Sequence, residues 1–323
     1  MRAVALISGG LDSALAAKLI IDQGIEVIGV NMLSPFFDNS HMAKDCCREL
    51  KIPLQIIDIS SEYLDIIKNP RYGFGKNLNP CIDCHAFMLK KAGRYMDEIK
   101  ASFLITGEVL GERPKSQSRF ALHVVGKESG YGSLVLRPLS ALLLEETYPE
   151  EKGLVSRRML LSLHGRSRRP QLELARRFGL TRFLTPASGC LLTDRCFSRR
   201  LRDLMNHSEL TLSDVELLKI GRHFRISETC KIVIGRNKQE NESLLRLVKS
   251  GDLCISVEGY KGPIGITRGE ITPDIILRSS SLCVRYSDAP TDAKVKVKYI
   301  LSKKTGQVLV KGEDATHLGI TMI

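Results

Sequence analysis

The chain has 323 residues, enough for two domains with cores of their own, since single domains usually run about 100–200 residues. Apolar residues make up 43% of the sequence and charged residues 26%, as in ordinary globular proteins. No stretch approaches the ~18–20 consecutive apolar residues of a membrane span, and the apolar start at residues 1–7 lacks the cleavage site of a signal peptide. We therefore expect a cytoplasmic protein that does not cross a membrane.

Residues 2–106 alternate between short apolar runs and segments with helical spacing, which predicts an α/β fold with a doubly wound parallel sheet. The expected strands are residues 2–7, 26–32, 54–59 and 101–106, and the expected helices are residues 12–22, 42–50 and 87–99. Sheets of this kind bind ligands at the carboxyl ends of their strands. The glycine turn after the first strand is therefore a candidate binding site.

This turn has the sequence Ser-Gly-Gly-Leu-Asp-Ser and spans residues 8–13. Its glycines let the backbone approach a phosphate group closely, and the N-terminus of the next helix offers unpaired N–H groups to the anion. The serine hydroxyls can donate further hydrogen bonds, and Asp12 is well placed to hold Mg²⁺ against the phosphates. The spacing is neither the GxxxxGK[ST] of P-loop nucleotidases nor the dinucleotide-binding GxGxxG. The candidate phosphate-binding residues are Ser8, Gly9, Gly10, Asp12 and Ser13.

The pattern changes after Leu180, where short β-type runs punctuated by glycine and proline follow one further helical segment. The helix is expected at residues 212–220, and the strands at residues 231–235, 253–257, 281–286, 294–300 and 307–311. These segments predict a smaller, β-rich α+β domain. We place the boundary near residues 203–212, which gives domains of residues 1–203 and 212–323.

The net charge of +12 is concentrated in one segment, because residues 151–202 carry 13 basic and three acidic side chains. Twelve of those 13 are arginines, whose guanidinium groups suit phosphates and base planes, so the segment favours an RNA partner over a solvated helix face. An aromatic content of 6% with no tryptophan favours recognition of backbone and shape over stacking. The candidate RNA-binding residues here are Arg168, Arg169, Arg176 and Arg177.

The nine cysteines are an odd number, which argues against a full disulfide framework. Cys81 and Cys84 form a CxxC pair, and Cys190 is a third candidate ligand. Three thiolates with one open position suit a 4Fe–4S cluster, and the alternatives are persulfide chemistry and a structural zinc site. Cys196 is a reserve ligand, and we interpret His85 as a polar residue at a helix start. The other cysteines are expected to be buried small apolar residues: Cys46, Cys47, Cys230, Cys254 and Cys283.

Residues 8–13 match every fixed position of SGGxDS, and so resemble the signature of the PP-loop ATPases. The resemblance implies an enzyme that cleaves ATP between its α- and β-phosphates, with ATP and Mg²⁺ held at this loop. The signature alone leaves open GMP synthetases, asparagine synthetases, deazaguanine-forming ligases and RNA thiolases.

Further stretches resemble tRNA thiolation enzymes. Residues 105–112 with residues 116–118 resemble the TGExxGQxxSQ of 4-thiouridine synthetases, although Glu112 stands where that family usually has glutamine. Residues 136–139 resemble the RPL segment of the same enzymes. The resemblance implies that Thr106 and Gly107 belong to the nucleotide site.

The cysteine segments resemble thiolases too. Residues 79–81 resemble the NPC segment of the 2-thiouridylases, and Ser188-Gly189-Cys190 lies where thiolases carry a second cysteine. The resemblance implies that Cys81, Cys84 and Cys190 hold a 4Fe–4S cluster and act in catalysis together with Asp12.

Residues 232–241 resemble the GRNxxxN motif of the RNA-binding domain found in NFACT proteins, with residues 286–288 as a second matching point. This resemblance covers about residues 212–311 and implies that Arg236 and Asn237 contact RNA. The domain would then replace the THUMP domain with which 4-thiouridine synthetases hold tRNA. The alternative is a β-rich domain that serves only to stabilise a homodimer.

Together these features predict a tRNA sulfurtransferase. ATP would adenylate a base carbonyl, pyrophosphate would leave, and sulfur from sulfide or a persulfide carrier would displace AMP. The alternatives are a PP-loop ligase that forms an amide or nitrile on a small molecule, and a non-catalytic RNA-binding protein. The intact loop at residues 8–13 argues against the last, and the arginine segment argues against the small-molecule ligase.

Overall fold

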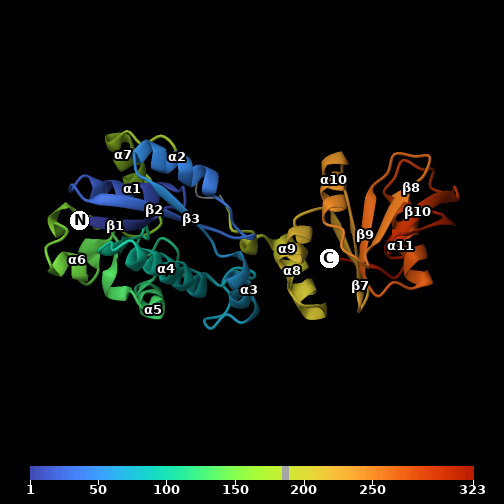
Figure 1. The fold of residues 1–323 in the computed structure, drawn as a ribbon, viewed down its shortest axis with the longest axis horizontal. Helices are drawn as coiled ribbons and strands as arrows, with labels where there is room; N and C mark the ends of the chain where they lie inside the picture. Colours follow the sequence, from blue (N-terminus) through green and yellow to red (C-terminus); the bar gives the residue numbers. More distant parts are fainter. Residues whose placement is uncertain (184–188) are drawn as a thin grey trace. The chain divides into compact units, whose positions relative to one another are not determined.

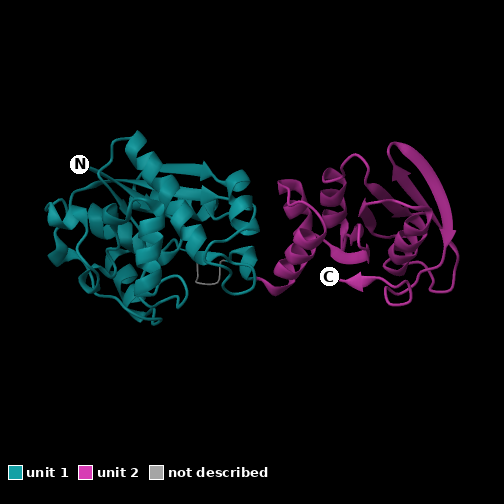
Figure 2. Cartoon of the chain, turned by 90° about the horizontal axis from the view of Figure 1, so that it is seen from below, with its two compact units in different colours: residues 1–193 teal, residues 194–323 magenta. Residues whose placement is uncertain are grey.

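The computed structural model describes residues 1–183 and 189–323. The chain divides into two compact units, Met1–Thr193 and Asp194–Ile323, which are coloured separately in Figure 2. Each unit has its own sheet and its own apolar core. Among the helices of the described residues, none has the length and apolar character needed to cross a bilayer.

The first unit is a doubly wound α/β domain, so the predicted fold class is confirmed. Its five parallel strands lie in the order β3-β2-β1-β4-β5, and Figure 1 shows α1, α2 and α7 on one side of this sheet and α4 and α5 on the other. The strands are β1 (Arg2–Leu6), β2 (Glu26–Leu33), β3 (Leu54–Asp58), β4 (Phe103–Ile105) and β5 (Val135–Leu136). The helices are α1 (Leu11–Ile21), α2 (Ser40–Leu50), α3 (Ser60–Lys68), α4 (Cys81–Glu98), α5 (Arg119–Ser129), α6 (Tyr148–Glu151) and α7 (Arg169–Phe178).

The central strand β1 organises this core. Ala3, Val4 and Ala5 are fully buried, because β1 pairs with β2 on one edge and with β4 on the other while helices cover both faces. A strand buried on both faces has a continuous apolar sequence rather than an alternating one. The polar turn that starts at Ser8 therefore emerges at the carboxyl edge of the sheet.

Helix α4 begins earlier than expected, at Cys81 instead of Phe87. Pro80 lies immediately before the helix, where its missing N–H costs no hydrogen bond, and its carbonyl accepts the N–H of Cys84 at 2.8 Å. The CxxC pair consequently lies on the first helical turn rather than in a loop.

The second unit is built on a seven-stranded sheet with the order β11-β10-β8-β9-β7-β6-β12, in which every pairing is antiparallel. Its strands are β6 (Arg222–Ser227), β7 (Cys230–Ile234), β8 (Leu253–Val257), β9 (Ile264–Gly269), β10 (Val295–Leu301), β11 (Lys304–Val310) and β12 (Thr321–Met322). Its helices are α8 (Arg195–His207), α9 (Leu212–Leu218), α10 (Lys238–Arg246) and α11 (Pro273–Arg285).

The strand expected at residues 281–286 was wrong, because this segment is the last part of α11. Thr272 caps the helix by accepting the N–H of Ile275, and Pro273 occupies the first helical position, where its fixed φ favours the helix. The apolar side chains of α11 then recur at helical spacing and pack on the sheet, with Leu282 and Cys283 fully buried. The short apolar run at the end of α11 resembles a strand only when the helix-starting residues Thr272 and Pro273 are not considered.

The units divide between residues 193 and 194, ahead of the boundary expected at residues 203–212. Helix α8 belongs to the second unit because its side chains form hydrogen bonds and an ion pair with residues of that unit. The Arg200 guanidinium donates to the carbonyls of Leu218 and Gly221, and Asp203 forms an ion pair with Arg225.

A row of basic side chains crosses three strands of the second sheet. Arg225, Lys231 and Arg268 lie at paired positions on β6, β7 and β9. The two arginines form ion pairs with Asp203 and Asp214, whereas the buried Lys231 ammonium has no hydrogen-bond partner among the described residues. Burial, with the nearby arginine charges, lowers the pKa of Lys231 to about 8.

We predict that replacing Lys231 by Met stabilises the second unit at pH 7. A lysine whose folded pKa lies below its unfolded pKa favours unfolding while both states are protonated, and this penalty disappears as the pH rises from about 8 to about 10.5. The expected gain is on the order of 2–3 kcal/mol at pH 7 and vanishes near pH 10.5. Denaturant unfolding at several pH values measures it, with the exposed Lys238→Met as control. Equal pH dependence in wild type and Lys231→Met would contradict the assignment.

Candidate active site

The loops at the carboxyl edge of the first sheet enclose a cavity of about 300 Å³. The turn after β1, the last residues of β2, the segment after β4, the start of α4 and the residue Cys190 all contribute to its wall. The structure thus brings together the candidate phosphate-binding turn and all three candidate ligand cysteines. The residues that line the cavity include Ser8, Asp12, Cys81, Cys84, His85, Thr106, Gly107, Glu108, Glu112, Arg113, Arg168 and Cys190.

The glycine turn is closed by its own serines. The Ser13 hydroxyl donates to the Gly10 carbonyl at 2.8 Å and lies 3.3 Å from the Ser8 hydroxyl, which in turn accepts the N–H of Gly10. The N-cap residue of α1 is Gly10, which has no side chain to cap the helix, so the N-terminus of this 11-residue helix faces the turn and can meet an anion. The turn is therefore arranged to hold phosphate.

Two glycines are required by close approach. Gly9 has φ +76°, and a Cβ there would lie 2.7 Å from the Cβ of Met42. A Cβ on Gly107 would lie 2.4 Å from the backbone nitrogen of Ser13. Gly107 thus lets the segment after β4 pack directly against the phosphate-binding turn.

Asp12 lies among charged groups that sequence reasoning did not connect with it. Burial raises its pKa, while Arg168 and Arg113 act in the opposite direction, and the Arg168 guanidinium lies 3.7 Å from its carboxylate. Burial and the nearby Asp12 charge raise the pKa of Glu112. Two carboxylates and two guanidinium groups on one cavity wall suit a divalent cation with the phosphates that it accompanies.

A buried ion pair joins the two sequence stretches that resembled 4-thiouridine synthetases. The Glu108 carboxylate accepts hydrogen bonds from Arg137 Nε at 2.9 Å and the Thr106 hydroxyl at 3.1 Å, and lies 3.0 Å from His85 Nδ1. Burial alone would raise its pKa, but Arg137 and His85 hold it at about 2. His85 is therefore a member of a buried network rather than only a helix-start residue. The motif resemblance marked Glu108 and Arg137, but their pairing was not visible in it.

The three candidate ligand cysteines differ in their surroundings. Burial raises the pKa of Cys84 above the ordinary range and that of Cys190 to about 11. Burial raises the pKa of Cys81 as well, but Arg113 and Lys115 counteract it. The Cys81 thiol donates a hydrogen bond to Asn79 Oδ1 at 3.1 Å. All three are free thiols, and Arg113 counteracts the effect of burial at Cys190 as well as at Cys81.

The remaining cysteines lie outside this cavity. Cys46, Cys47, Cys230 and Cys283 are buried as expected, Cys254 is half-buried, and Cys196 is exposed on α8. Ser188, from the Ser-Gly-Cys segment, lies outside the described residues. Across residues 1–183 and 189–323, no three His, Cys, Asp or Glu side chains lie close enough to share a single metal ion.

The candidate RNA-binding residues fall into three settings. Arg168 lies in the cavity beside Asp12, whereas Arg169, Arg176 and Arg177 are exposed on α7. In the second unit, the side chains of Arg236 and Asn237 are engaged locally: Arg236 pairs with Glu240, and Asn237 caps α10 by accepting the N–H of Glu240. The GRN motif thus has a structural role at this turn.

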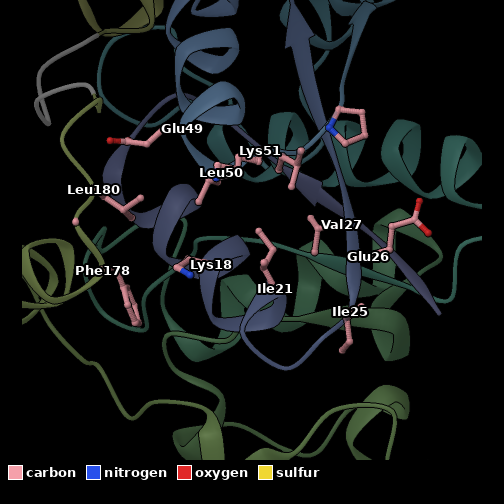
Figure 3. Close-up of a pocket in the computed structure, with 13 residues that line it drawn as sticks. Lys18, Ile21, Ile25, Glu26, Val27, Glu49, Leu50, Lys51, Phe178 and Leu180 are labelled. Atoms are coloured by element: carbon pink, nitrogen blue, oxygen red, sulfur yellow. The ribbon is translucent and has the colours of Figure 1, made fainter.

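A wider hollow of about 560 Å³ lies elsewhere on the first unit. Figure 3 shows Glu26 and Val27 at the start of β2 together with Lys18, Phe178 and Leu180 around it. It therefore adjoins the amino end of β2, whereas parallel α/β sheets bind ligands at the carboxyl ends of their strands. The smaller cavity is the better candidate site.

Both units of the chain resemble known protein families. Residues 1–148 match the family described as "tRNA methyl transferase HUP domain", and residues 221–318 match "NFACT protein RNA binding domain". The tRNA-specific 2-thiouridylase MnmA of Syntrophotalea carbinolica is 31% identical over 46% of this chain and 49% of its own length. The first unit is therefore similar, over residues 1–148, to the HUP domain of this family and to tRNA-specific 2-thiouridylases.

Two further similarities accompany these. MnmA 1 of Fusobacterium nucleatum is 35% identical over 33% of this chain and 30% of its own. A solved complex of a 4-thiouridine synthetase with RNA and bound ATP covers 53% of this chain and 49% of its own, with 21% identity and a TM-score of 0.36. The matched stretch spans half or less of each of these relatives. The predicted NFACT resemblance of the second unit is confirmed.

The neighbouring arginines Arg168 and Arg169 provide a test of the PP-loop site. Arg168→Gln should weaken ATP binding about 10–100-fold, the size expected for loss of a hydrogen bond between charged groups. Arg169→Gln should leave ATP binding unchanged, because Arg169 is exposed and pairs with Glu173. Titration with ATP and Mg²⁺ measures both. Equal losses in the two variants would contradict a special role for Arg168.

Proposed function

We propose that the protein is an ATP-dependent tRNA sulfurtransferase that forms AMP and pyrophosphate. One observation carries this proposal: the PP-loop and the three cysteines Cys81, Cys84 and Cys190 line a single cavity. A ligase acting on a small molecule would need the loop but not the thiols. An RNA-binding protein without activity would need neither.

The first step makes the oxygen of a tRNA base carbonyl a leaving group. The carbonyl oxygen attacks the α-phosphate of ATP, the bond between the α- and β-phosphates breaks, and pyrophosphate leaves. The N-terminus of α1 and the Ser8–Ser13 turn hold the departing phosphates, with Arg168 and Arg113 balancing their charge. Asp12 and Glu112 would hold Mg²⁺ against them. The base must leave its stack to reach this cavity.

In the second step sulfur attacks the activated carbon and AMP leaves with the former carbonyl oxygen. The thiol cavity delivers this sulfur beside the phosphate-binding turn. Glu108 fixes His85 and, through Arg137 and Thr106, the segment after β4, so that the two parts of the cavity keep their relative positions.

The three thiols fit a 4Fe–4S cluster. The protein ligands of such a cluster bind different irons, so their sulfur atoms must surround a shared space. Cys81, Cys84 and Cys190 meet this requirement in that they line one cavity. Cys81, Cys84 and Cys190 would hold the cluster, and binding would release their protons despite the raised pKa values. When bound, such a cluster supplies an iron without a protein ligand that can carry sulfide. Persulfide chemistry is the alternative, and Cys81 is its candidate because Arg113 and Lys115 counteract the effect of burial on the pKa of this thiol.

The RNA partner is proposed to be tRNA, held by the exposed arginines of α7 and by the second unit. Arg169, Arg176 and Arg177 supply positive charge on α7. The match of residues 221–318 to an RNA binding domain supports the second contact.

The activity is tested with purified full-length protein, unmodified tRNA, ATP and sulfide under anaerobic conditions. We expect AMP and pyrophosphate in equal amounts, and a thiolated nucleoside detectable by mass spectrometry of digested tRNA. Asp12→Asn should lower product formation at least 100-fold while tRNA binding is retained. Release of ADP instead of AMP would exclude the PP-loop reaction.

The cysteines are tested with Cys81→Ser, Cys84→Ser and Cys190→Ser, and Cys196→Ser serves as the control because it is exposed in the second unit. Each of the first three should lose iron, acid-labile sulfide and thiolation together, whereas the control should keep all of them. Thiolation by iron-free protein, with covalent sulfur on Cys81, would favour persulfide chemistry over the cluster.

A further inference from the structure

The arginines of the second unit are mostly engaged within it. Arg225 and Arg268 form ion pairs with Asp203 of α8 and Asp214 of α9, Arg236 pairs with Glu240, and Arg285 pairs with Asp314. Arg278 donates to the carbonyl of Leu318. Apart from the exposed arginines of α8 and α10, the positive charge that this unit offers to an RNA surface comes from its lysines.

The hairpin of β10 and β11 carries such charge. Residues 294–311 contain six lysines and no acidic residue, and none of these lysines forms an ion pair with any described residue. All six are exposed: Lys294, Lys296, Lys298, Lys303, Lys304 and Lys311. The hairpin therefore carries six exposed positive charges that no ion pair among the described residues takes up.

Because successive side chains of β10 point to opposite faces of the sheet, two of these lysines lie on the same face. Val295 and Val297 are buried in the core, so Lys296 and Lys298 point to the opposite side. Across the hairpin, Lys296 lies opposite Leu309 and Lys298 lies opposite Gln307. The core face of this part of the sheet is covered by α11, while the lysine face is exposed.

We propose that the outer face of the β10–β11 hairpin binds the phosphate backbone of RNA. The proposal rests on the proposed function, because it names the surface by which the second unit would hold the tRNA. Lys296 and Lys298 stand about 6.8 Å apart along the strand, a separation similar to that of successive phosphates in a nucleic acid strand. Lysine is a mobile point charge, which suits backbone contact rather than base reading.

One carboxylate and two exposed aliphatic side chains accompany the lysines of the hairpin. The carboxylate of Glu258, at the edge of this face, is 3.3 Å from the amide nitrogen of Gln307, which can donate to it. The exposed aliphatic side chains of Ile300 and Leu309 stand singly between polar neighbours. The face thus lacks the continuous apolar patch by which an obligate protein partner would be recognised.

The test measures binding of unmodified tRNA to the full chain by fluorescence anisotropy across a range of salt concentrations. Lys296→Gln/Lys298→Gln should bind about tenfold more weakly near 0.1 M salt, and its log–log salt slope should be smaller by about 2. Lys238→Gln/Lys261→Gln removes two exposed charges elsewhere on this unit and should bind like wild type. Lys296→Arg/Lys298→Arg keeps the charge and should restore binding. ATP binding should be unchanged in every variant.

The outcomes separate this surface from the function on which it rests. Wild-type binding by the Lys296→Gln/Lys298→Gln variant, or an equal loss in the Lys238→Gln/Lys261→Gln control, overturns the hairpin surface and leaves the proposed function intact. Failure of the wild-type protein to bind tRNA defeats both. Binding of the wild type to vesicles containing phosphatidylserine, lost in the hairpin variant and without tRNA binding, would assign the face to a membrane and overturn the RNA proposal.

Discussion

The buried pair of Glu108 and Arg137 is the contact on which the candidate active site depends. Its carboxylate also bonds Thr106, next to the glycine that packs on the PP-loop, and lies within 3.0 Å of His85, one residue after the CxxC pair. Removing one partner of such a pair costs about 3–5 kcal/mol, since the other charge is left buried alone. The pair thereby fixes the position of the phosphate-binding turn relative to the start of α4, where the CxxC pair lies.

The cavity combines charged groups with buried thiols. Arg113 and Arg168 stand near Asp12 and Glu112, so charge is available to balance phosphates and a divalent cation. The thiols of Cys84 and Cys190 are buried with raised pKa values, and Arg113 acts on Cys190 as well. Thiols in such surroundings stay protonated until a ligand of opposite charge replaces their protons. The arrangement suits a reaction in which sulfur must be kept from water until the base has been activated.

The second unit uses its charges in two ways. Arginines bind carboxylates and carbonyls inside the unit and fix α8, α9 and α11 to the sheet, whereas the lysines of the β10–β11 hairpin are exposed and form no ion pair within the part of the chain that the structure describes. A guanidinium group with several fixed donors suits the first task, and a flexible ammonium group suits the second. Part of the basic character of the sequence is therefore structural.

The sequence by itself determined the α/β fold, and it pointed to the glycine turn and to the three cysteines that line one cavity, because these depend on local periodicity and on short motifs. It also placed β8 at residues 253–257, where the structure has it. Only the tertiary structure decided which distant side chains meet. Arg168, which was expected to bind RNA, lies beside Asp12. Asn237 of the GRN motif caps α10. Neither contact could be predicted, because the sequence does not show which distant residue a polar side chain will contact. Residues 281–286 became helix for a related reason: the cap at Thr272 and the packing of α11 on the sheet outweighed the strand-like composition of a short apolar run.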